Sequence, residues 1–177
     1  MNPSFEQIFE QLENQRSITL DSIRHLTDAQ LTKAPFRGKW SLAQIFSHLI
    51  TAERLSLAYV QKKMLGIQDI SDSGFLEEVK IIVLKISQRL PGIRFRAPKR
   101  VVENTAVYQD FGTIQREWDA VRNDWRAALE KIKSDQVRKL VYRHPLAGYL
   151  NIGQCLIFFR EHIIHHTPQI KRLINQK

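Results

Sequence analysis

The chain has 177 residues, of which 43% are hydrophobic and 25% charged, with only 7 Gly and 6 Pro. This composition excludes a disordered, collagen-like or low-complexity chain and suits one domain over residues 1–177. The formal net charge of +9 would suit an anionic partner but does not identify one.

Three features of the sequence lead us to expect a cytoplasmic protein. No apolar run approaches the ~20 residues that span a bilayer, so no membrane partner is expected. The first residues lack the basic region and apolar stretch of a signal peptide. Cys155 is the single cysteine, which excludes an intramolecular disulfide and fits a reducing compartment.

Apolar residues recur at helical spacing through most of the chain, beginning with Phe5, Ile8, Phe9 and Leu12. The pattern predicts helices over residues 4–26, 41–64, 75–90, 113–133 and from 151 onwards. Three of the expected helix starts have the form of a capping box: Thr27 with Gln30, Ser41 with Gln44, and Asn151 with Gln154.

The segment between the second and third long helices, residues 66–110, is less regular. It contains the short helix expected at 75–90, then a basic stretch from Arg94 to Arg100 that we expect to be an exposed loop. Residues 137–142 could be extended, but they are too few to build a sheet. The sequence therefore predicts an all-α fold, a single helical bundle of four long helices and one shorter helix.

Two histidines of the last helix lie on its apolar stripe. His162 and His166 are spaced i and i+4, so both imidazoles can reach one metal ion. His48 flanks the inner face expected for the helix at 41–64 and is the candidate third ligand. Three histidines leave one coordination position open for water or a thiol, as in catalytic metal sites. The alternative is that these histidines are ordinary core residues.

Other reactive side chains have simpler interpretations. His165 lies off the apolar stripe and His144 stands in a turn before Pro145, so neither is expected to be a ligand, although His144 could line the mouth of a pocket. Cys155 is expected to pack in the core. Glu161 could support a ligand, but an exposed helix position is the favoured interpretation.

The motifs and their order resemble the DinB-like (damage-inducible) superfamily over nearly the whole chain. The matching segments are Trp40-Ser41, His48-Leu49, His144-Pro145-Leu146-Ala147-Gly148, and His162 and His166 followed by Gln169-Ile170. The resemblance implies an up-down four-helix bundle with a long connection after the second helix, often a homodimer. It also implies a divalent metal ion, commonly zinc or nickel, held by His48, His162 and His166.

Members of that superfamily include thiol S-transferases that use low-molecular-weight thiols such as bacillithiol, and metal hydrolases. The resemblance therefore implies a metal-dependent enzyme acting on a small molecule, a thiol S-transferase or a hydrolase, with a thiol as co-substrate in the first case. Two alternatives remain. One is a non-catalytic dimeric metal-binding or interaction module, and the other is a basic protein associated with nucleic acid. No recognition-helix motif supports the second.

Overall fold

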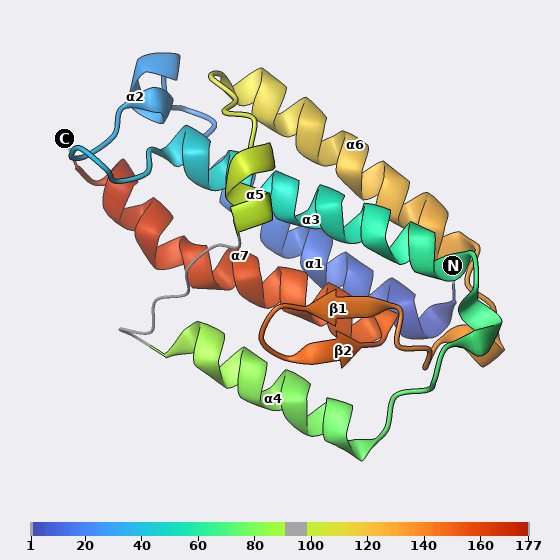
Figure 1. Ribbon diagram of the computed structural model, residues 1–177. Helices are drawn as coiled ribbons and strands as arrows, with labels where there is room; N and C mark the ends of the chain where they lie inside the picture. Colours follow the sequence, from blue (N-terminus) through green and yellow to red (C-terminus); the bar gives the residue numbers. More distant parts are fainter. Residues whose placement is uncertain (1, 91–98, 177) are drawn as a thin grey trace.

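The computed structural model describes residues 2–90 and 99–176, and its main elements are helices (Figure 1). The helices and strands, in chain order, are α1 (Pro3–Asp21), α2 (Asp28–Thr32), α3 (Leu42–Met64), η1 (Ile67–Asp69), α4 (Phe75–Arg89), α5 (Lys99–Asn104), α6 (Phe111–Glu130), η2 (Ser134–Gln136), β1 (Tyr142–His144), β2 (Gly148–Leu150) and α7 (Ile152–Ile174). The predicted all-α class is confirmed. Over the described ranges, no helix is both long and apolar enough to cross a membrane.

Four long helices, α1, α3, α6 and α7, form the bundle, and their directions are up, down, down, up (Figure 1). Helices α1 and α7 run parallel, since Gly153 lies beside Phe5 at one end and Arg160 bonds Gln11 further along. Helices α3 and α6 also run parallel to each other. Two consecutive core helices can be parallel only if a long connection carries the chain back, and residues 65–110 are that connection.

Local sequence signals placed most helix starts correctly. All three capping boxes are present, at Thr27, Ser41 and Asn151. The first helix is shorter than predicted: α1 ends at Asp21, and residues 22–26 continue as tighter turns with bonds such as Leu26 N–H to Ile23 O. Helix α6 begins two residues before the predicted position because the side chain of Asp110 accepts from the Thr113 amide.

The expectation of no paired strands was wrong. Tyr142–His144 pairs antiparallel with Gly148–Leu150 in a small hairpin. Nδ1 of His144 accepts hydrogen bonds from the Leu146 and Ala147 amides at 3.2 and 3.0 Å, which holds the turn closed. Gly148 has a φ of 75°, a conformation that glycine adopts without steric cost.

The basic stretch expected as a loop is only partly described. Residues 94–98 lie outside the described residues, whereas Lys99 opens α5, so the end of that stretch is helical rather than a loop. Helix α5 packs against α3. Helix α4 lies along α7 on the outside of the bundle (Figure 1).

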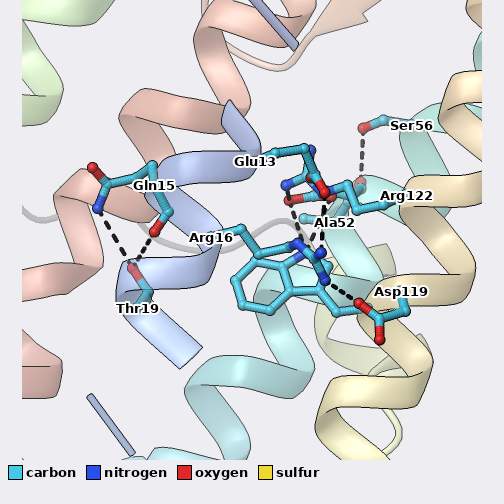
Figure 2. A network of polar contacts seen from close by, with 10 residues as sticks. Glu13, Gln15, Arg16, Thr19, Ala52, Ser56, Asp119 and Arg122 are labelled. Atoms are coloured by element: carbon cyan, nitrogen blue, oxygen red, sulfur yellow. Dashed lines mark hydrogen bonds and ion pairs between the residues drawn. The ribbon is translucent and has the colours of Figure 1, made fainter. Parts of the chain in front are cut away.

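A buried polar network ties α1, α3 and α6 together. Glu53 of α3 accepts a 2.7 Å bond from Arg122 of α6 and two weaker bonds from the Trp118 indole. Figure 2 shows α1 meeting α6 beside this pair, where Glu13 faces Arg122 and Arg16 bonds Asp119. These contacts set how α1, α3 and α6 align along their length.

Candidate metal centre

Three histidine side chains converge where α3 meets α7. Nε2 of His162 lies 3.2 Å from Nε2 of His48 and 3.2 Å from Nε2 of His166. The ligand atoms of the three all lie within 4.8 Å of one another, and this is the cluster of potential metal ligands found among the described residues. The structure thus brings together the three predicted side chains, although 114 residues separate His48 from His162.

The spacing of these nitrogens fits one bound ion. Zinc–nitrogen bonds of ~2.0–2.1 Å at tetrahedral angles place two ligand nitrogens roughly 3.3–3.4 Å apart. The two separations of 3.2 Å are close to that value. Three nitrogens on one side leave the fourth tetrahedral position for another ligand.

The hydrogen-bond partners of the ring nitrogens also favour a cation shared by the three histidines. The Nδ1–H of His166 donates to Oε1 of Gln169 at 3.1 Å, so a neutral His166 presents the lone pair of Nε2 to the cluster. Nε2 of His162 has ring nitrogens on two sides and carries at most one hydrogen. One hydrogen cannot serve both neighbours fully, whereas a cation satisfies all three lone pairs.

Aromatic rings fix the orientation of two imidazoles. The Trp40 ring lies 5.0 Å from that of His48, and the Phe158 ring stacks on His162 with centroids 5.4 Å apart. Nδ1 of His48 is buried and has no hydrogen-bond partner among the described residues. Packing against Trp40 therefore orients His48, while a hydrogen bond orients His166.

The environment of the cluster favours the neutral form of its three imidazoles, which is the form that can bind a cation. Burial lowers the pKa of His48 to about 4 and that of His166 to about 3. Burial and the neighbouring imidazoles also lower the pKa of His162 well below its usual range. All three rings are neutral at physiological pH, which is the form that binds metals.

The remaining histidines lie outside the cluster. His25 is exposed. His165 has Nδ1 2.9 Å from the Gln88 carbonyl of α4 and donates to it. His144 is buried against Phe158, with ring centroids 4.4 Å apart, and its Nδ1 is engaged in the hairpin turn. Phe158 thus contacts both His144 and His162.

The favoured interpretation of Glu161 as an exposed residue was wrong. Its side chain is 1% exposed and accepts two bonds from Arg89 of α4, at 2.6 and 2.8 Å, and one from Arg160. It therefore anchors α4 on α7. Cys155 is fully buried, as expected, and burial raises the pKa of its thiol, so it is not a reactive nucleophile.

Two residues that support the cluster were not identified from the sequence as supports. Gln169 follows His166 by three residues, which places it on the same helix face, and this spacing could have revealed it. Phe158 precedes His162 by four residues and could have been found in the same way.

The chain is similar to known proteins in sequence and in fold. The chain is 24% identical to the uncharacterized protein YuaE of Bacillus subtilis (strain 168) over 155 residues, covering 88% of this chain and 90% of YuaE. Its fold is similar to that of YfiT from Bacillus subtilis, described as a probable metal-dependent hydrolase with an unusual four-helix bundle topology. That similarity has a TM-score of 0.58 at 16% identity, over 98% of this chain and 87% of YfiT. The family model of the DinB superfamily matches residues 11–170, and the chain belongs to that superfamily.

Proposed function

We propose that this protein is a metal-dependent enzyme whose ion is held by His48, His162 and His166. The observation that carries the proposal is the convergence of their three Nε2 atoms, two of the separations being 3.2 Å. A divalent ion held there would act as a Lewis acid and lower the pKa of a bound water or thiol. The description of YfiT as a probable metal-dependent hydrolase supports the same class of chemistry.

The surroundings of the cluster favour thiol transfer over hydrolysis. Hydrolytic metal sites commonly pair the ion with a carboxylate base. Here the ion-binding cluster of the described residues consists of histidines alone. The two buried glutamates of the described residues, Glu53 and Glu161, each bond to arginine side chains and are not part of that cluster. A thiol needs no such base, since metal coordination alone removes its proton.

One of the pockets among the described residues lies beside Trp40. A shallow pocket of about 90 Å³ is lined by Trp40, Gln44, Val102, Thr105 and Val107. Because Trp40 also contacts the His48 ring, a molecule in this pocket would lie near the cluster. Its lining combines apolar side chains with an amide and a hydroxyl, which suits part of a small polar molecule.

The first test is the metal content of untagged protein by mass spectrometry. We expect about one equivalent of a divalent ion in the wild type, lost when His162→Ala and His166→Ala are combined. The matched control is His25→Ala, which removes an exposed histidine outside the cluster and should retain the ion. Wild-type protein that takes up no zinc, nickel or manganese at neutral pH would overturn the proposal.

The second test separates the two reactions. The loaded enzyme is assayed for addition of a low-molecular-weight thiol to an electrophile and, in parallel, for hydrolysis of esters and amides. We expect thiol consumption that disappears in the double histidine variant. Hydrolysis without thiol transfer would support the hydrolase instead, and metal binding with neither reaction would support a non-catalytic metal-binding module.

A further inference from the structure

Helix α4 runs alongside α7 and bonds to it near both of its ends (Figure 1). Near its start, Glu78 accepts a bond from Gln154 at 3.0 Å. At its end, Arg89 donates two bonds to Glu161, the residue that precedes the candidate ligand His162. Helix α4 therefore ends beside the part of α7 that carries the histidine cluster.

The end of α4 leaves a backbone carbonyl that α7 caps. Because α4 ends at Arg89, the Gln88 carbonyl is one of its last four, which have no partner within the helix. The Nδ1–H of His165 donates to this carbonyl at 2.9 Å. Side chains of histidine, lysine or arginine can satisfy the last carbonyls of a helix in this way. Here the capping side chain comes from a different helix.

The same imidazole packs against a candidate metal ligand. The ring of His165 lies edge to face against that of His166, with centroids 5.3 Å apart and planes at 82°, a favourable arrangement of aromatic rings. His166 is also held by its hydrogen bond to Gln169. His165 is thus in contact with α4 through Nδ1 and with the cluster through its ring.

Helix α7 has a weak point close to these two histidines. Pro168 lies inside the helix and has no amide hydrogen, so the Ile164 carbonyl lacks its usual partner four residues on. Interior prolines are also the commonest sites of helix kinks. Contacts from outside α7 therefore contribute more to the position of His166 than they would in an uninterrupted helix.

The docking of α4 can change without unfolding of the bundle. Its buried residues are Ile81, Leu84 and Gln88, whereas side chains on the opposite face such as Phe75 and Val83 are 84% and 59% exposed. Segments with few buried apolar contacts open locally at a lower free energy than the core. Hydrogen exchange in α4 should therefore report its docking on α7.

We propose that His165 is a positioning residue that couples the docking of α4 to the metal centre. The Gln88 carbonyl fixes the ring of His165, and that ring holds His166 in the orientation that binds the ion. The inference rests on the proposed metal site. Because coupling between two equilibria is reciprocal, bound metal should in turn hold α4 on α7.

The test is hydrogen–deuterium exchange of the full chain, followed by mass spectrometry of peptides from Phe75–Arg89, with and without saturating zinc. Supports of metal ligands change affinity by ~10–100-fold. At the lower end of that range, we expect zinc to slow exchange in wild-type α4 by ~10-fold, since linkage requires the same factor in both directions. Competition with a chelator gives the zinc Kd of each protein.

Two variants each break one half of the link. His165→Phe keeps an aromatic ring against His166 but cannot donate to the Gln88 carbonyl. His165→Asn keeps a donor close to the position of Nδ1 but has no ring. In both variants we expect zinc to slow exchange in α4 by less than ~2-fold and the zinc Kd to rise by up to ~10-fold. A merely structural cap would instead speed exchange equally with and without zinc.

The matched control is His25→Asn, the same change at an exposed histidine outside the cluster, which should leave both measurements at their wild-type values. Circular dichroism checks that all variants remain folded. Zinc binding that leaves exchange in wild-type α4 unchanged, or a slowing that both His165 variants retain, would overturn the coupling alone. A wild type that binds no zinc would overturn the proposed metal site and the coupling with it, so the two failures are distinguishable.

Discussion

Gln169 should tune the affinity of the histidine cluster. Its amide oxygen accepts the Nδ1–H of His166 at 3.1 Å, so it fixes which nitrogen of that ring faces the ion. Gln169→Leu keeps a similar volume and removes the acceptor. Loss of one neutral hydrogen bond costs ~1–1.5 kcal/mol, and supports of this kind change metal affinity ~10–100-fold. We therefore expect the metal Kd to rise at least ~10-fold.

The assay is competition between the protein and a chelator for zinc at neutral pH. Gln169→Glu is the informative companion variant. A carboxylate accepts the same hydrogen bond more strongly and so makes Nε2 of the imidazole a stronger ligand for the metal. It should bind at least as tightly as the wild type. Gln176→Leu makes the same change at an exposed position beyond α7 and should have no effect. Equal affinity in all four proteins would refute the orienting role of Gln169.

Three further perturbations have definite expected outcomes. First, acid should release the metal near pH 4, because the pKa values of His48 and His166 are lowered to about 4 and about 3, well below the ~6.5 of an exposed histidine. Between about pH 4 and ~6.5, the histidines of the unfolded chain bind more protons than those of the folded, metal-free protein. The metal-free protein should therefore also lose stability as the pH falls. Chelator-coupled titration measures the release of the metal, and urea denaturation measures the loss of stability. Second, Arg122→Leu removes the buried partner of Glu53 and should lower the free energy of unfolding by ~3–5 kcal/mol at neutral pH. Burial already raises the pKa of Glu53 to about 7, so protonation at lower pH should reduce that loss in urea denaturation. Third, Ser41→Ala removes the cap of α3 and should cost ~1 kcal/mol, measured by thermal unfolding.

Each outcome can be contradicted. Metal release near pH 6 would show that the histidines are not desolvated as described. A loss in Arg122→Leu that does not change with pH would argue against a titrating Glu53. The control for the cap is Ser17→Ala, the same change at an exposed position inside α1. If that variant lost as much stability as Ser41→Ala, the loss could not be assigned to the capping box.

The parts of the fold that could be predicted are those encoded over a few residues. Ser41 and Gln44 form their capping box within one helical turn, and the prediction for the start of α3 was correct. His162 and His166 share a face by spacing alone. The position of His48 beside the inner face of its helix made it a candidate ligand. Whether its ring reaches the other two depends on how α3 pairs with α7, which spacing does not give, and here the family resemblance strengthened the expectation.

The wrong predictions concern features that depend on contacts between segments far apart in the sequence. Glu161 follows Arg160 on a helix and has no local signal of burial; its environment is created by Arg89 of α4, 72 residues earlier. The strands β1 and β2 have three residues each, too few to show alternation, and the hairpin depends on His144 bonding the turn. The long connection between α3 and α6 was predicted, but the parallel direction of these two helices was not, because it depends on the path that the connection takes.

The pairing of α1 with α7 has a consequence for synthesis on the ribosome. Helix α1 is synthesised before α7, along which it packs. Its apolar residues Phe5, Phe9 and Leu12, all buried in the folded protein, therefore lack that partner while the chain between α1 and α7 is made. Chains grow at ~5–20 residues per second, so this surface stays open for several seconds. The nascent chain therefore offers a target for chaperones until translation has passed α7.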